Sequence, residues 1–326
     1  MLINVFKNQK PASSVLTLLI FALFWLSDWF LHPVEIQLSG GMPLYMLLVE
    51  LIGDSLWVHQ IVTGIMIWLA AISLNGAVNR QDMFKSKNNL TLFFVIFLIC
   101  CIPEVVNPSP ALWSLPFFAL SIRELYKLYF DEGSLMIALN ASLFLSLSWL
   151  MYFPIIVFFP ILWIAILING YTDWRHITAV VLGFLTPPFI AFSVWVWIPG
   201  LVDLTSLNYW TALRTGQIDL TIRPANLPVM IAVLITAVTG TVELTLNLGK
   251  KRVSNRKNFL LMIWVIIAAL LGFFVSPANQ FTHLSVLALP MSLVMANLFY
   301  YLKKPLWTNL VMVALLATAL ISVLVT

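Results

Sequence analysis

The chain has 326 residues, of which 61% are hydrophobic and 9% are charged, and its formal net charge is +4. A water-soluble domain carries about 25% charged residues, so this composition excludes a soluble globular protein. The apolar stretches have about the 20 residues that a helix needs to cross the hydrocarbon core. They lack the alternation of apolar and polar residues that marks barrel strands. The sequence therefore predicts an all-α, polytopic bundle of transmembrane helices.

The predicted elements are the apolar stretches taken in chain order. Residues 134–169 form one nearly continuous apolar run. We divide this run at Tyr152–Phe153–Pro154, because a single helix over it would be about 54 Å long and would exceed the bilayer core even when tilted. With this division, the sequence predicts about eleven membrane spans: 13–31, 57–77, 89–106, 110–130, 134–151, 154–169, 177–198, 228–248, 258–276, 283–302 and 305–325.

The basic residues predict how these spans are oriented, because short cytoplasmic loops collect Lys and Arg. With the N-terminus in the cytoplasm, every Lys and Arg except Arg214 and Arg223 falls on the cytoplasmic side. A single span over 134–169 would instead place the basic segment 249–258 outside. We therefore expect a multi-pass protein of the bacterial cytoplasmic (inner) membrane. The positive balance reflects topology and gives no indication of nucleic-acid binding, whereas a basic cytoplasmic rim suits anionic membrane lipids.

Two outer segments are too long to be simple turns. The first covers 32–56, and its second half predicts a helix lying in the membrane interface, with Glu50 and Asp54 four residues apart on one face. The second, 201–227, contains both outer arginines. Long extramembrane segments on a helical scaffold are where functional residues concentrate.

Soluble-enzyme motifs are absent from the sequence. It contains no glycine-rich phosphate loop, no His or Cys pairs at metal-binding spacing, no nucleophile elbow and no dinucleotide fingerprint. The remaining candidates are therefore single ionisable residues on the predicted outer side.

Carboxylates are the main candidates at the outer side. Asp28 lies near the end of the first span, where an unpaired carboxylate would cost roughly 2.5–3.5 kcal/mol, so it should face the bundle or a hydrated cavity. A functional role and a structural ion pair both explain this position, and Glu35 follows in the loop after Pro33. Glu50 and Asp54 repel each other slightly at their spacing. A divalent metal ion held with water would satisfy them, and a solvated helix face explains them equally well.

The layout resembles the GT-C superfamily of polytopic glycosyltransferases, which use sugars linked to polyprenyl phosphate. A loop that carries carboxylates and an interfacial helix follows the first span. A helix, a basic turn, a small-residue helix and an aromatic-proline break follow in "FFALSIRELYKLYFDEGSLMIALNASLFLSLSWLMYFPIIVFFPILWIAILI". The segment "SPANQFTHLSVLALPMSLVMANLFYYLKK", which contains His283, is similar to a late span of the family that enters the membrane from an outer His or Arg and contains a central proline. The family usually has an acidic residue, often an Asp-Glu pair, just beyond the first span, whereas here Asp28 and Glu35 are separated by "WFLHPV".

The resemblance implies a three-part organisation and a chemistry. Residues 1–200 would form a GT-C-like core of about seven spans, 201–227 the long outer loop and 228–326 a C-terminal four-span region. The activity would be transfer of a sugar from a polyprenyl-phosphate donor to an acceptor outside the cytoplasm. A carboxylate, Asp28 or Glu35, would act as general base. Cations would bind the lipid phosphate, and the candidates are Arg214, Arg223 and His283, with His283 also explained as an ordinary interfacial residue.

Two other classes remain open from the sequence. The separated acidic pair also fits a non-catalytic GT-C-like subunit of a cell-envelope assembly or secretion machine, with envelope proteins as partners. Glu243 within a span, together with Pro187 and Pro188, fits a transporter or lipid flippase. The sequence shows no internal repeat in support of that last alternative.

Overall fold

The computed structural model describes residues 2–9, 11–31, 36–38, 41–129, 134–197, 223–276, 280–302 and 305–325. This part of the chain is helical and contains no strand, only an isolated bridge between Gly41 and Tyr152. The first helices are α1 (Leu2–Phe6), α2 (Pro11–Leu31), α3 (Pro43–Ile52), α4 (Leu56–Arg80), α5 (Leu90–Cys100), α6 (Pro103–Val106), α7 (Pro110–Leu125), η1 (Tyr126–Tyr129) and α8 (Ser134–Trp149). The later ones are η2 (Phe153–Phe158), α9 (Phe159–Asn169), α10 (Trp174–Trp197), η4 (Pro224–Asn226), α12 (Leu227–Asn247), η5 (Leu248–Lys250), α13 (Val253–Gly272), α14 (Gln280–Tyr301) and α15 (Pro305–Val325).

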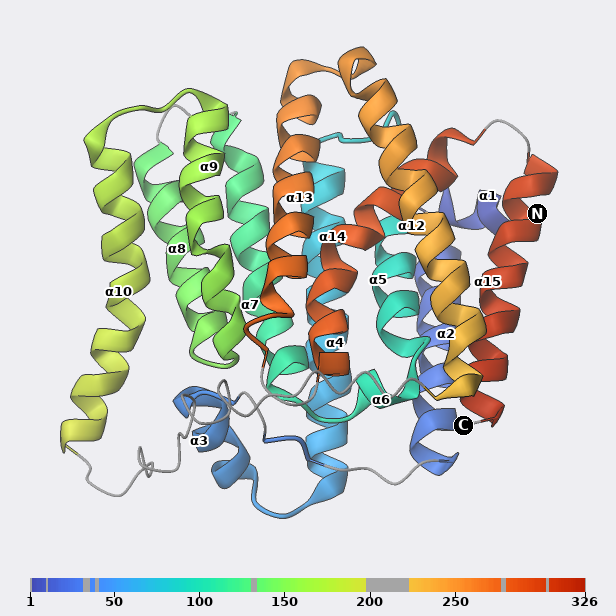
Figure 1. Cartoon of the computed structure of the whole chain (residues 1–326), viewed down its shortest axis with the longest axis horizontal. Helices are drawn as coiled ribbons and strands as arrows, with labels where there is room; N and C mark the ends of the chain where they lie inside the picture. Colours follow the sequence, from blue (N-terminus) through green and yellow to red (C-terminus); the bar gives the residue numbers. More distant parts are fainter. Residues whose placement is uncertain are drawn as a thin grey trace.

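Six helical segments of the described chain are long and apolar enough to cross a membrane, judged by length and composition. They are Leu56–Arg80, Trp174–Val194, Pro224–Lys250, Val253–Gly272, Thr282–Tyr301 and Leu306–Leu324. Shorter apolar helices, among them Leu90–Cys100 and Ser134–Trp149, pack beside them in the bundle (Figure 1). The prediction of an all-α, multi-pass membrane protein is therefore confirmed.

One predicted segment, 89–106, is two helices in the structure. The backbone of Ile102 is extended, with φ −126° and ψ 112°, and it separates α5 from α6. The following residue is Pro103, whose ring disfavours a helical conformation in the residue before it. The proline was visible in the sequence, but membrane helices also tolerate proline, so its presence alone did not predict a break.

The predicted division of 134–169 is confirmed. Helix α8 ends at Trp149, Tyr152 is extended (φ −139°, ψ 116°), and Pro154 lies at the start of η2. Backbone N–H groups at the start of α3 satisfy the carbonyls of this turn, with Met42 N donating to Met151 O at 3.1 Å and Leu44 N to Leu150 O at 3.1 Å. The turn at this break is therefore hydrogen-bonded to the start of α3, the short helix that follows α2.

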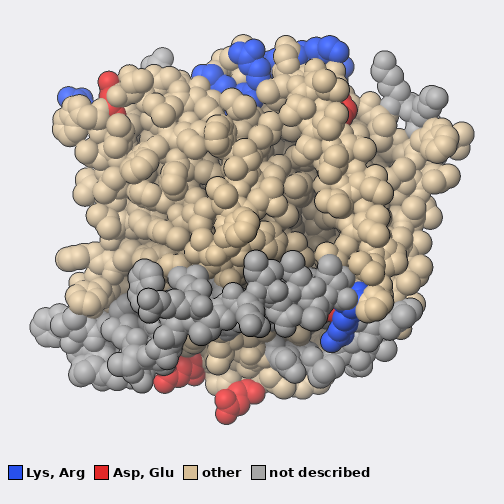
Figure 2. Space-filling model, viewed as in Figure 1, with Lys and Arg blue, Asp and Glu red and all other residues tan. Residues whose placement is uncertain are grey.

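Charge is divided between the two ends of the bundle. All described Lys and Arg residues except Arg223 lie at the end where α4, α7, α12 and α14 finish, and we call it the basic end (Figure 2). The other end, called the opposite end below, holds α3, α6 and the described acidic residues Glu50, Asp54 and Glu104.

Asparagine side chains connect the helices at the basic end. Asn75 of α4 donates to Asn89 Oδ1 at 3.1 Å, and Asn89 donates to Ser13 Oγ of α2 at 2.7 Å. Asn79 donates to the Asn88 carbonyl at 2.8 Å and accepts from the Asn88 backbone N–H at 3.1 Å. All five residues are at most 7% exposed. Because few other partners exist inside an apolar bundle, these bonds hold α2, α4 and the start of α5 together.

A glycine allows the close packing of α10 against α8. A Cβ atom added to Gly183 would lie 2.6 Å from the backbone oxygen of Leu139 and would also collide with the Ser142 hydroxyl. Small residues at such crossings let two membrane helices approach closely. Gly76 of α4 has no atom within 4 Å of the corresponding position.

These two glycines predict opposite outcomes for the same substitution. Gly183→Ala should destabilise the protein by about 1–3 kcal/mol, because a backbone oxygen cannot move aside as a side chain can. Gly76→Ala should stay within about 0.5 kcal/mol of the wild type or be slightly more stable. Thermal unfolding in detergent micelles measures both. Equal melting temperatures for the two variants would contradict the packing of α8 and α10.

Candidate functional site

Several of the residues predicted to be functional lie outside the described part of the chain. The backbone of Asp28 belongs to α2, three residues before its end at Leu31. The side chain of Asp28 and the whole of Glu35 and Arg214 lie outside the described residues. Arg223, His283, Glu50 and Asp54 are described, and their surroundings follow.

Arg223 forms an ion pair with Glu104. Its Nε lies 3.2 Å from Glu104 Oε1, with 56% of the arginine side chain and 24% of the glutamate side chain exposed. The other carboxylate oxygen accepts from Asn226 Nδ2 at 2.7 Å, and Asn226 Oδ1 accepts from Ser322 Oγ at 2.6 Å. These bonds join α6, η4 and α15 at the opposite end of the bundle. Glu104 was not predicted from the sequence to be functional. The one feature that pointed to it was that it is a carboxylate on the predicted outer side, where few cations lie.

The arrangement leaves Arg223 able to bind an anion. The contact with Glu104 is made through Nε, and 56% of the arginine side chain is exposed, so the guanidinium is accessible to an anion such as a phosphate. An exposed ion pair contributes only about 0–1 kcal/mol, so exchange of its partner is inexpensive. Glu104 also lowers the net positive charge that a phosphate would meet at this position.

An apolar groove of about 350 Å³ begins beside this ion pair. It lies between α12 and α14, with α5 behind them (Figure 1). Ile102 and Leu227 line one end of the groove. In the sequence, Ile102 is two residues from Glu104 and Leu227 directly follows Asn226. From Leu227 to Ala237 the groove follows α12 for about 15 Å, half the thickness of the hydrocarbon core. Its lining is apolar: Leu98, Cys101, Ile102, Leu227, Met230, Ile231, Val233, Leu234, Ala237, Leu284, Leu287, Ala288 and Met291.

His283 is enclosed by protein and is 0% exposed. Its Nε2 lies 2.9 Å from the Ala269 carbonyl, which can only accept, so Nε2 carries the hydrogen. Nδ1 then accepts from the Tyr152 hydroxyl at 3.3 Å. A Cβ atom at Gly272 would lie 2.5 Å from Nε2, so this glycine makes room for the ring. Because both ring nitrogens are hydrogen-bonded and the side chain is buried, His283 is not accessible to a lipid phosphate.

Glu50 and Asp54 do not lie on one helix, in contrast to the prediction. Gly53 takes a φ of +73°, which ends α3 at Ile52, so Asp54 lies beyond the helix. Both carboxylates are exposed. Among the described residues, no three His, Cys, Asp or Glu side chains are placed to hold a metal ion. The described structure therefore gives no support to a metal site at Glu50 and Asp54.

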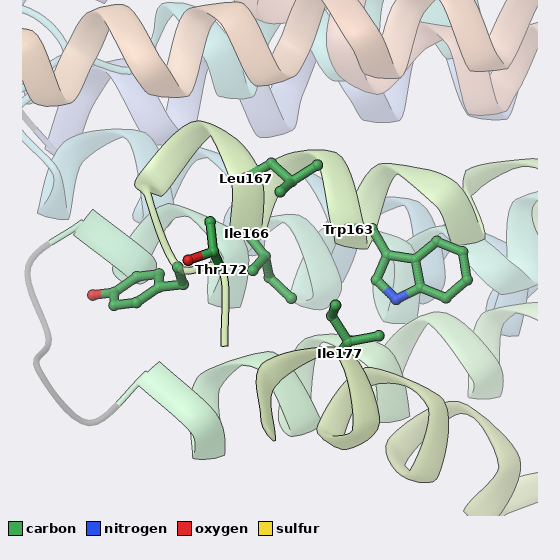
Figure 3. A pocket seen from close by; sticks show the side chains of 6 residues that line it. Trp163, Ile166, Leu167, Thr172 and Ile177 are labelled. Atoms are coloured by element: carbon green, nitrogen blue, oxygen red, sulfur yellow. The ribbon is translucent and has the colours of Figure 1, made fainter. Parts of the chain in front are cut away.

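Two further cavities are apolar and lack charged side chains. One, of about 310 Å³, lies between α9 and α10, where Trp163 and Ile177 approach from the two helices (Figure 3). The other, of about 440 Å³, is bordered by α3, α8 and α10, including Leu44, Leu147 and Pro187. Their lining residues carry no charge, and Tyr171 in the first cavity is the one ionisable residue among them.

Comparison with known proteins gives a family. A family model described as DUF6427, a family of unknown function, matches residues 12–325, which is nearly the whole chain. The chain belongs to this family. No curated protein and no solved structure matches the chain.

A second polar cluster lies at the basic end. Glu243 Oε2 accepts from Asn297 Nδ2 at 2.6 Å, and Lys251 Nζ donates to Asn297 Oδ1 at 2.7 Å. The Lys251 ammonium also lies over the rings of Phe259 and Tyr301, at 4.4 and 4.5 Å. Asn297 thus connects Glu243 to Lys251. Burial lowers the pKa of Lys251 to about 8, and the negative charge of Glu243 opposes this shift.

The lowered pKa of Lys251 predicts how stability depends on pH. The unfolded chain keeps Lys251 protonated up to about pH 10.5, whereas the folded protein releases this proton near pH 8. Between these values the unfolded state binds more protons, so this residue makes stability rise with pH. Lys251→Met should reduce the rise in melting temperature between pH 8 and 10 measured in detergent.

The control is Lys250→Met, which removes a charge from the same surface at an exposed side chain that donates to Asn247. It should keep the wild-type dependence on pH. An unchanged pH dependence in Lys251→Met would show that Lys251 is not desolvated as described.

Proposed function

We propose that the protein crosses the bacterial cytoplasmic membrane with about eleven spans and with its N-terminus in the cytoplasm. Helices occupy the predicted segments in order, and the described basic residues, Arg223 excepted, gather at one end of the bundle. By the positive-inside rule this basic end is the cytoplasmic one. The opposite end, which carries α3 and the Arg223–Glu104 pair, then faces outward.

The activity we propose is transfer of a sugar from a polyprenyl-phosphate donor at this outer face, by a GT-C-like enzyme. The observation that carries the proposal is the apolar groove between α5, α12 and α14, whose outer end adjoins Arg223 and Glu104. The groove follows the hydrocarbon depth of one leaflet and suits an isoprenoid chain. The arginine at the level of the headgroups suits the phosphate that the chain carries.

Each step of the transfer has a candidate residue. The acceptor hydroxyl attacks the anomeric carbon of the donor sugar while a carboxylate, Asp28 or Glu35, takes its proton. The bond between the anomeric carbon and the phosphate oxygen breaks, and the lipid phosphate leaves with both bonding electrons. Arg223, together with Arg214, stabilises the charge that develops on this leaving group.

A second function is favoured by a separate observation. Glu104 already neutralises part of the charge of Arg223, and His283 is enclosed. Among the described residues predicted to bind phosphate, only Arg223 therefore remains, and it is paired. This arrangement also suits a non-catalytic membrane subunit of an envelope assembly machine that binds lipid without transferring sugar. Partners that co-purify in stoichiometric amounts would support it.

The transfer activity predicts a loss of donor consumption in two variants. The assay follows a radiolabelled polyprenyl-phosphate sugar incubated with purified protein in nanodiscs and with cell-envelope extract as the source of acceptor. Changing the base, by Asp28→Asn or Glu35→Gln, should reduce the rate at least about 100-fold in one variant, because general-base catalysis contributes 100- to 10,000-fold. Asp173→Asn, at an exposed carboxylate of the basic end, should leave it unchanged. An inactive wild type, or full activity in both base variants, would overturn the catalytic proposal.

A further inference from the structure

Gln60 in α4 is fully buried, yet its side-chain amide has no partner. It is 0% exposed, and neither Nε2 nor Oε1 makes a hydrogen bond. An unpaired buried polar group costs about 1–3 kcal/mol, and native proteins satisfy nearly all such groups. Both amide atoms of Gln60 are therefore open to a bound molecule that supplies the missing partners.

Gln60 lies on the face of α4 whose neighbouring positions contact tryptophans of α2. A Cβ atom at Gly64 would lie 3.0 Å from Cζ2 of Trp25, and the ring of Trp57 lies 4.2 Å from that of Trp29, measured between centroids. Positions 57, 60 and 64 share one face of a helix. Gln60 thus lies between the two levels at which α4 contacts the tryptophans of α2. We call these five residues the Gln60 site.

The site offers a definite chemistry. The indole Nε1 of Trp25 is also buried without a partner, so the site has an unpaired acceptor in Gln60 Oε1 and unpaired donors in Gln60 Nε2 and Trp25 Nε1. The rings of Trp25 and Trp29 adjoin, with centroids 5.3 Å apart. None of the described side chains in the site is charged. A ligand that matches it is neutral, both donates and accepts hydrogen bonds, and has an apolar face to lie on an indole ring.

We infer that the Gln60 site binds a neutral pyranose ring. The hydroxyl groups of such a sugar donate and accept, and its axial C–H groups form an apolar face that packs on tryptophan. The inference rests on the proposed function, because Asp28 lies in α2 three residues after Trp25 and its backbone is therefore about one turn away. The sugar would be held beside the residue proposed to act on a hydroxyl group.

Binding of free sugars to the purified protein in nanodiscs tests the inference. The probes are the methyl glycosides of glucose, galactose, mannose and N-acetylglucosamine, with saturation-transfer NMR and calorimetric titration as measurements. At least one should bind the wild type with a Kd of about 1 mM or lower. Gln60→Leu and Trp25→Phe should each weaken this binding about tenfold or more, because each removes a hydrogen-bond partner, and Gln60→Leu does so while keeping a similar shape.

A matched control comes from the cavity between α9 and α10. Trp163 also has a buried indole Nε1 without a partner, and it lines a different cavity. Trp163→Phe should bind sugar as the wild type does. Gln60→Leu should melt at or above the wild-type temperature, since replacing an unpaired amide with an apolar group of similar shape removes a desolvation cost. This measurement separates loss of binding from loss of folding.

The outcomes separate this inference from the proposed activity, because no donor lipid is used. Sugar binding that depends on Gln60, in a protein that consumes no donor, would leave the inference standing and the transferase proposal overturned. No saturation transfer from any of the four glycosides, together with a more stable Gln60→Leu variant, would indicate a site for water only and would overturn the inference. Wild-type affinity in Gln60→Leu and Trp25→Phe would overturn it as well.

Discussion

The hydroxyl group of Tyr152 joins three separate parts of the chain. It donates to His283 Nδ1 of α14 and lies 2.9 Å from the hydroxyl of Ser276, which follows α13, while its own residue lies in the turn between α8 and η2. Burial raises the pKa of Tyr152 far above its usual value, so the hydroxyl keeps its proton and remains a donor. Few alternative partners exist in an apolar bundle, so these bonds fix where the turn lies.

Much of the opposite end depends on this turn. The backbone of Met151 and Leu150 accepts hydrogen bonds from the start of α3, so the turn also positions the short helix that follows the first long one. If α8 continued into α9 as one helix, every later helix would run in the reverse direction, and the basic segment after α12 would move to the end that holds α3 and α6. By fixing this turn, the Tyr152 contacts keep the basic segment at one end of the bundle and the candidate sites at the other.

The sequence predicted the helices well because their limits depend on length and local chemistry. The break near Pro154 follows from the thickness of a bilayer, and it is present. The placement of Glu50 and Asp54 on one helix was wrong, because Gly53 adopts a left-handed conformation that ends α3, and a glycine can equally well continue a helix. The division of 89–106 was missed for a similar reason, since Pro103 permits a break without requiring one.

The contacts of the candidate sites could not be predicted in the same way, because they join residues far apart in the sequence. Arg223 was expected to bind the lipid phosphate, and its partner Glu104 precedes it in the chain by four helices, α7, α8, α9 and α10. His283 is enclosed because Gly272 of the neighbouring helix lacks a side chain. Gln60 is buried on the face of α4 where Trp57 and Gly64 meet tryptophans of α2. No periodic pattern in the sequence records such pairings.

The binding mode that we propose places a polyprenyl phosphate in the groove between α5, α12 and α14 with its phosphate at Arg223. Photolabelling tests it most directly, using a polyprenyl phosphate with a diazirine in its chain, the protein in nanodiscs, and peptide mass spectrometry to locate the label. We expect label on groove residues such as Met230, Leu234 and Leu287, and less label there in Arg223→Gln. Label confined to the cavity bordered by α3, α8 and α10, or spread evenly over the lipid-facing helices, would contradict this binding mode.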